Sequence, residues 1–200
     1  DGSSKLGADN KWGFFPSASA AWLISNEPWF AGLKDKITTL KLRASYGLVG
    51  NDKIGSTRFL YLSQVNMSDA NYGAQFGTLN NGEHYNGISV SRYANPTIGW
   101  EVAKKSNLAL EFVWKDRLHL TTEYYVEKRD DILQTRASTP ASMGLASQPQ
   151  ANLGRAEGRG VDVELNYSRT FANRSWLQIR GNMTFAKSKY IVLEEYSYPD

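Results

Sequence analysis

The residues best suited to acid–base or metal chemistry are few and scattered in this 200-residue sequence. His84 and His119 lie too far apart for their spacing to indicate a metal site. Asp130 and Asp131 could supply paired carboxylates, but neighbouring residues of a strand point to opposite faces. The glycine-rich stretch GRAEGRG at 154–160 lacks phosphate-loop spacing, and no helix pattern follows it. Cysteine is absent, which excludes thiolate nucleophiles and zinc–thiolate sites. The sequence therefore predicts no catalytic centre, no metal site and no cofactor.

The sequence contains more residues suited to binding a ligand than residues suited to catalysis. A long segment at about 50–99 is rich in Gly, Asn and Ser, and it carries six aromatic residues: Phe59, Tyr61, Tyr72, Phe76, Tyr85 and Tyr93. Aromatic rings with amide neighbours suit the stacking of sugars or the capture of peptides. Packing of these rings on one another or against a partner protein explains the same composition, so both interpretations stay open.

The elements that must position these residues are β-strands. In TLKLRASYGLVGN (39–51) the residues Leu40, Leu42 and Leu48 alternate with polar neighbours, the period of a strand with one apolar and one polar face. Similar patterns occur in five further segments, at 12–24, 101–114, 117–128, 160–171 and 176–187. Shorter candidates at 58–65 and 87–93 could extend the sheet or fold as a hairpin within the loop. The sequence predicts an all-β, antiparallel protein.

Two architectures fit these faces. A soluble β-sandwich would bury the leucines between two sheets, whereas a transmembrane barrel would turn them to lipid and face a wet lumen with the opposite side. In the barrel the predicted lumen-facing residues are Lys41, Arg43, Lys105, Glu111, His119 and Glu123. No apolar run approaches the roughly 18 residues of a transmembrane helix.

Loop lengths and aromatic positions favour the barrel. The parity of the apolar faces predicts that Trp114 pairs with Leu118 across a three-residue turn. The joint at about 172–176 is also short, whereas those at about 50–99 and 129–158 are long, as in outer-membrane barrels. Strands of ten to twelve residues at ~3.3 Å each and a ~40° tilt span roughly 25 Å, and aromatic residues fall near both ends of them.

Five motifs, in order, resemble a known family: WGFFPSASAAWLIS, LKLRASYGLVGN, NPTIGWE, LHLTTEYYVEKRDDIL and NLGRAEGRGVDVELNY. Together they are similar to the C-terminal half of the barrel in SusC/RagA-type TonB-dependent transporters of Bacteroidetes. The resemblance implies that residues 1–200 are about six to eight strands of one larger, probably 22-stranded barrel domain, without its plug or signal peptide. One departure is Gly158, where the family usually has asparagine; we expect it to make the same tight bend.

The resemblance further implies an importer in the bacterial outer membrane. It would move oligosaccharides or peptides into the periplasm with energy from TonB, which contacts parts outside this chain, and with a SusD-like surface lipoprotein. The alternative is a soluble β-sandwich that binds carbohydrate or mediates adhesion. The formal net charge is only +3 and the basic residues are scattered, so we expect no nucleic-acid partner.

Overall fold

The computed structural model describes residues 1–53, 58–78 and 82–195, and its regular structure is mostly antiparallel β. The strands are β1 (Ser17–Leu23), β2 (Ile37–Asn51), β3 (Gln64–Phe76), β4 (Glu83–Arg92), β5 (Glu101–Trp114), β6 (Leu118–Thr135), β7 (Gln150–Thr170) and β8 (Trp176–Val192). Short 3-10 helices lie at Ala8–Asn10 (η1), Ile24–Asn26 (η2), Pro28–Leu33 (η3) and Ala141–Met143 (η4). None of the described helices has the length and apolar character needed to cross a membrane.

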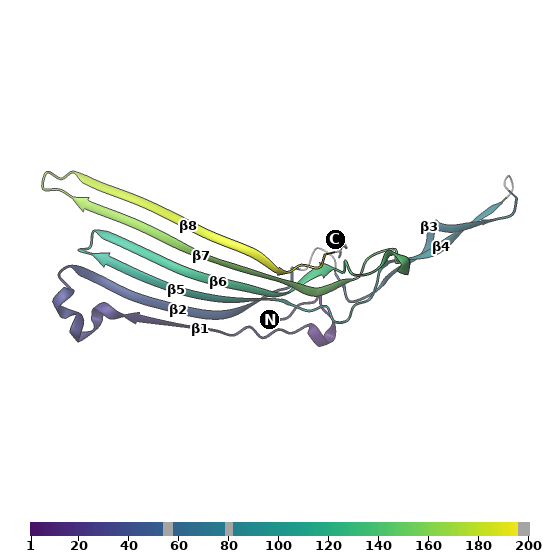
Figure 1. The fold of residues 1–200 in the computed structure, drawn as a ribbon, viewed down its shortest axis with the longest axis horizontal. Helices are drawn as coiled ribbons and strands as arrows, with labels where there is room; N and C mark the ends of the chain where they lie inside the picture. The colour runs from purple at the N-terminus through teal and green to yellow at the C-terminus, as the bar shows by residue number, and fades with distance from the viewer. Residues whose placement is uncertain (54–57, 79–81, 196–200) are drawn as a thin grey trace, which may run out of the picture.

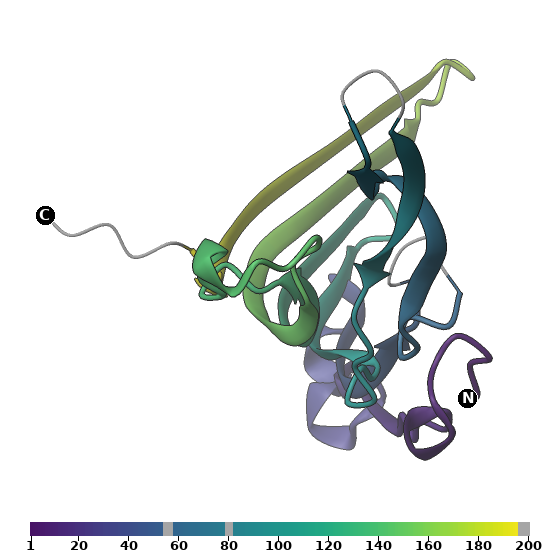
Figure 2. The same ribbon diagram turned by 90° about the vertical axis from the view of Figure 1, so that its right-hand side faces the viewer.

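Six strands form one sheet in the order β1-β2-β5-β6-β7-β8, and every neighbouring pair is antiparallel. The sheet is long, twisted and curved, and it does not close on itself (Figures 1 and 2). Trp114 pairs with Leu118, as the parity of the sequence predicts, and Thr170 pairs with Trp176 across the second short turn. The all-β, antiparallel prediction is confirmed.

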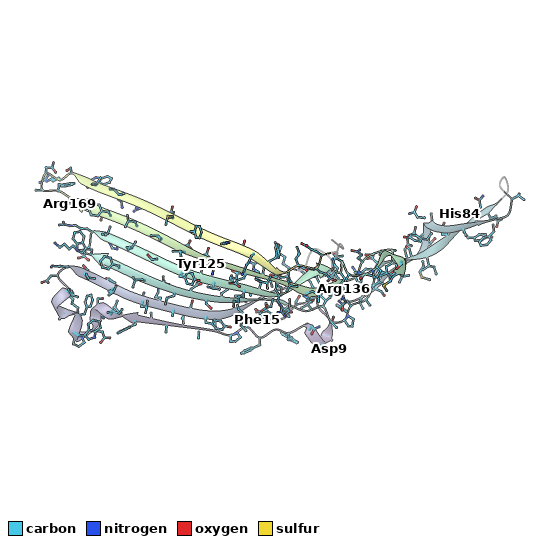
Figure 3. The ribbon with its side chains drawn as sticks, in the orientation of Figure 1. Asp9, Phe15, His84, Tyr125, Arg136 and Arg169 are labelled. Atoms are coloured by element: carbon cyan, nitrogen blue, oxygen red, sulfur yellow. The ribbon has the colours of Figure 1, made fainter. Side chains whose placement is uncertain are left out.

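The connections divide between the two ends of the sheet, as predicted. At one end lie η2 and η3, the turn 115–117 and the turn 171–175. The connections 52–100 and 136–149 lie at the other end, where the β3–β4 hairpin projects well beyond the sheet (Figure 1). We call these the short-turn end and the long-loop end. Arg169 lies near the first and Arg136 near the second (Figure 3).

The hairpin decides between the two possibilities for the short strand candidates. In the part of the chain that the structure describes, β3 and β4 pair only with each other, in a separate two-stranded sheet with three register shifts, and do not extend the main sheet. They lie within the loop predicted at about 50–99, of which positions 54–57 and 79–81 are outside the described residues.

Three local expectations need correction. β6 and β7 continue to Thr135 and from Gln150, so the connection 136–149 is shorter than the predicted loop at about 129–158. A bulge at Asp131, with φ of 60°, lets the ladder continue through this polar stretch. β1 begins only at Ser17, after Pro16, although the pattern suggested a strand from Trp12. Gly158 makes no tight bend, because it pairs with Glu127 and Ser188 inside a continuous strand.

The apolar face of the sheet is not covered by a second layer. One row crosses five strands through Leu42, Leu110, Thr122, Val163 and Met183, each paired with the next. Leu110 is 39% exposed and Met183 is 63% exposed. Among the described residues the hydrophobic core is a small cluster of Leu6, Leu60 and Ile98, packed against Trp100 and Leu133. This face therefore has no partner within the described chain.

Candidate functional site: the polar face and the outer hairpin

The strand register places the six predicted lumen residues on one face of the sheet. Lys41 pairs with Glu111, and Arg43 pairs with Ala109, which in turn pairs with Glu123. The full set on this face, all at odd positions of β2, β5 and β6, is Lys41, Arg43, Lys105, Glu111, His119 and Glu123. We call it the polar face; that it lines a lumen stays a prediction.

Three of the six residues form one charge network. A Glu111 carboxylate oxygen lies 2.6 Å from Nε of Arg43, and the other lies 3.5 Å from Nζ of Lys41. Lys105 instead reaches Glu127 on β6, with Nζ 3.5 Å from the carboxylate. These side chains remain about a quarter to a half exposed, so each pair is worth little stability and its main effect is to fix the local charge pattern.

Sequence reasoning missed a second charge cluster on the same face, nearer the long-loop end. Arg129 forms an ion pair with Glu127 and lies 3.8 Å from Glu101, which accepts a hydrogen bond from the Asn51 amide at 3.2 Å. A cleft of about 510 Å³ is lined by Glu101, Glu127 and Arg129. Glu101, Glu127 and Arg129 are all odd-numbered, like the other residues of the polar face on β5 and β6. The sequence could have shown this, but the predicted strand ended at residue 128 and so left out Arg129.

His119 and Glu123 do not join these networks. His119 is exposed and lies beside Thr121, Glu164 and Asn166 in a small pocket. Glu123 lines a different hollow together with Arg43 and Asn107. Within the described residues, no three His, Cys, Asp or Glu side chains gather as metal ligands would.

The six aromatic residues predicted for ligand or partner contact are distributed over four places. Before β3, the rings of Phe59 and Tyr61 pack edge-to-face with their centroids 6.2 Å apart. Across the hairpin, the ring centroids of Phe76 and Tyr85 are 5.9 Å apart. Tyr72 lies on β3 and is 56% exposed. Tyr93 lines a cleft of about 540 Å³ at the base of the hairpin. They therefore make two ring pairs and two separate rings.

Two hydrogen-bonded carboxylates help to order the hairpin. Asp69 accepts from Oγ of Ser89 at 2.5 Å and from the backbone N–H of Asn71 at 3.0 Å, and these bonds lower the pKa of Asp69. The Tyr85 hydroxyl donates to Glu83 at 2.5 Å, which raises the pKa of Tyr85. Because the lowered pKa favours the Asp69 carboxylate in the folded hairpin, its contribution is lost only as the pH falls into the acid range.

Asparagines tie the connection before β5 to the start of β7 and to the N-terminal segment. Nδ2 of Asn95 donates to the carbonyl of Gln150 at 2.6 Å. Asn152 accepts from the N–H of Gly99 at 3.0 Å and donates back to its carbonyl at 3.2 Å. Nδ2 of Asn10 lies 3.2 Å from the carbonyl of Ile98. The motif NPTIGWE (95–101) is thus a structural joint, a role that only contacts distant in sequence reveal.

We expect Glu111→Ala to be tolerated. The substitution frees Lys41 and Arg43, but both are partly hydrated, so the loss of stability should stay below ~1 kcal/mol. The measurement is the temperature at which the full-length protein loses its folded, faster-migrating gel band. A drop as large as that caused by removing a buried ion-pair partner would show that this face is not hydrated.

The geometry so far is one sheet with an uncovered apolar face, a polar face and loops sorted by length. The family model for the TonB-dependent receptor-like β-barrel matches residues 1–199. The chain belongs to this family. TonB-dependent receptor P3 of Formosa agariphila is 34% identical over 179 residues, covering 88% of this chain and 16% of the relative. TonB-dependent receptor SusC of Bacteroides thetaiotaomicron is 31% identical over 170 residues, covering 83% of this chain and 16% of SusC.

Solved structures share the fold of this TonB-dependent receptor chain. A structure of the RagAB peptide transporter superposes with a TM-score of 0.75 at 24% identity, covering 100% of this chain and 21% of that one. The open-open state of the RagAB peptide importer gives a TM-score of 0.77 at 22% identity, covering 98% of this chain and 20% of that one. The SusC/RagA resemblance is confirmed, and the open sheet is a section of a family barrel.

The chain spans 16% of the length of these curated relatives. It supplies six neighbouring strands of wall and one projecting hairpin. The family consists of outer-membrane transporters and receptors. The described residues form part of the barrel wall and part of its loop surface.

Proposed function

We propose that this chain is part of an outer-membrane importer of the SusC type, without a catalytic role. The importer moves oligosaccharides or peptides into the periplasm, drawing its energy from TonB. A SusD-like surface lipoprotein works with it at the long-loop end. Lipid contacts the apolar face of the wall, and the substrate passes along the polar face.

The observation that carries this proposal is the asymmetry of the sheet. Leu108 and Leu110 stand 49% and 39% exposed on one face, while the ion pairs of Glu111 and Glu127 occupy the other. A soluble sandwich would cover that leucine face with a second sheet of the same domain. A barrel wall needs no such cover because hydrocarbon takes its place.

The substrate class rests on the hairpin and on the relatives. Exposed aromatic rings with amide neighbours on β3 and β4 suit flat sugar faces or apolar peptide side chains. RagAB is described as a peptide transporter, and SusC is among the sequence relatives. The experiment that follows therefore measures uptake of both oligosaccharides and peptides.

Fractionation of the full-length protein tests the proposal. We expect the protein in the outer-membrane fraction, soluble only in detergent, with a gel mobility that changes on boiling. A deletion strain should lose uptake of labelled oligosaccharides or of labelled peptides, and a tagged protein should co-purify with a surface lipoprotein. Recovery in the soluble fraction without detergent would support the sandwich instead.

Removing the hairpin ring pair should reduce uptake without impairing assembly. In Phe76→Ser/Tyr85→Ser both rings are lost from a surface that supports no other part of the sheet. Uptake at low substrate concentration should fall about two- to tenfold, which corresponds to ~0.5–1.5 kcal/mol of lost stacking. Ile88→Ser is the matched control, because Ile88 is exposed on the same hairpin but outside the ring pair. Equal uptake by both variants would count against substrate contact at the rings.

A further inference from the structure

The apolar face of the sheet ends within one cross-strand row of the same height on four neighbouring strands. Towards the long-loop end, β5 changes from Leu108 to Lys104, and β6 from Tyr124 to Lys128. β7 changes from Val161 to Arg159, and β8 from Phe185 to Lys187 and then Lys189. The register joins these positions into two cross-strand rows, which run through Ser106, Val126, Arg159 and Lys187, and through Lys104, Lys128, Glu157 and Lys189. We call the five cations of these rows, Lys104, Lys128, Arg159, Lys187 and Lys189, the cationic rim.

The height of the rim matches the edge of a bilayer. Ten residues separate Trp114, at the short-turn end of β5, from Lys104. At ~3.3 Å per residue and a ~40° tilt, this distance projects to about 25 Å, the thickness of the apolar band of an outer-membrane barrel. The rim therefore lies where lipid headgroups begin. Because long loops face outward in such barrels, these headgroups are those of the outer leaflet.

The charges of the rim are not balanced within the described chain. Arg159 and Lys187 are direct cross-strand partners, an arrangement that repels when nothing lies between the two cations. Within the described residues, no ion pair reaches Lys128, Arg159, Lys187 or Lys189. The rim cation with an acidic partner is Lys104, which lies 2.8 Å from Asp130. Glu157 sits between Lys128 and Lys189 in the register, so five cations face two acids.

A groove shows where an anion would fit. A small hollow of about 100 Å³ between β7 and β8 is lined by Glu157, Arg159, Lys187 and Lys189, and the three cations are exposed. A further strand beside β8 would pair with its backbone edge and leave this face open. Guanidinium and ammonium groups around one hollow are the usual partners of phosphate oxygens.

We propose that the cationic rim binds a phosphorylated lipid headgroup of the outer leaflet, the phosphate of lipid A, with Arg159, Lys187 and Lys189 as its main ligands. The acyl chains of that lipid lie along Phe185, Met183 and Val163 below it. The proposal rests on the proposed function, because it requires the apolar face to be in the outer membrane. It concerns the outer surface of the wall, away from the substrate path.

The test uses the full-length protein purified in detergent and then exchanged into lipid-free detergent. Lipid A should raise the unfolding temperature, whereas dephosphorylated lipid A and inorganic phosphate should not. The variant Arg159→Gln/Lys187→Gln/Lys189→Gln should bind lipid A about a hundredfold more weakly. The matched control, Arg43→Gln/Lys105→Gln, removes cations from the polar face and should bind as the unchanged protein does.

Each result separates the two proposals. Equal stabilisation by lipid A with and without phosphate overturns the rim proposal and needs no variant that might misfold. Stabilisation by inorganic phosphate alone would instead assign the rim to a soluble anion. If the protein is recovered outside the outer membrane, the proposed function fails. If it is in the outer membrane and imports substrate, but the triple variant binds lipid A normally, the rim proposal alone fails.

Discussion

Leu110→Arg should abolish or severely reduce assembly of the full-length protein. Leu110 lies in the middle row of the apolar face, between Leu42 and Thr122. An arginine at the midplane of a bilayer costs ~2–4 kcal/mol. This is a large share of the stability of an ordinary folded protein, which is about 5–15 kcal/mol. The measurement is the amount of protein in the outer membrane that shows a heat-modifiable gel band.

Asn107→Arg is the matched control for this substitution. Asn107 lies on the same strand but on the polar face, where it is exposed and pairs with Ser45 and Tyr125. The same charge there should remain hydrated and leave assembly nearly unchanged. If the two arginine variants assembled equally well, the assignment of lipid to the apolar face would be wrong. If Asn107→Arg alone failed, the faces would be reversed.

Gly160→Val should destabilise the wall, whereas Gly158→Val should not. A Cβ at Gly160 would lie 2.7 Å from the carbonyl oxygen of Phe185 and would also collide with the hydroxyl of Tyr125. Backbone cannot move aside as a flexible side chain can, so the cost should be at least the ~1–3 kcal/mol of an overpacked site. The measurement is the unfolding temperature of the folded gel band.

Gly158 provides an internal comparison two residues away. Among the described residues, no atom outside Glu157 and Arg159 lies within 4 Å of a Cβ built there, and both glycines belong to the polar face of β7. The pair therefore separates steric crowding from any general intolerance of β7 to substitution. Similar unfolding temperatures for the two valine variants would show that Tyr125 does not pack over Gly160 in the assembled barrel.

The strands and their faces were readable from the sequence because side chains alternate with a period of two. Leu40 and Lys41 could be assigned to opposite faces without coordinates, and parity alone predicted the pairing of Trp114 with Leu118. Strand ends were less predictable. The bulge at Asp131 and the continuation of β7 through Gly158 keep polar, glycine-rich residues in the ladder, although such residues locally favour turns.

The candidate site was predicted only in part. Membership of a face follows from parity, so Lys41, Arg43 and Glu111 were placed correctly together. Contacts between Glu101 and Arg129, or between Asn95 and Gln150, depend on which strands are neighbours and how the loops fold back. The grouping of the six loop aromatics into ring pairs likewise needed the hairpin register.

The sequence by itself determined that this chain makes long amphipathic strands joined by alternating short and long connections. It also carried the resemblance to the transporter family. Tertiary structure alone decided that the leucine face has no second layer within the described residues, and that the cations of β5 to β8 align in one rim. The physical reason is that the alternation of apolar and polar residues is a local property of each strand. Whether a second layer covers a face, and whether cations of different strands align, depends on the register that brings distant strands side by side.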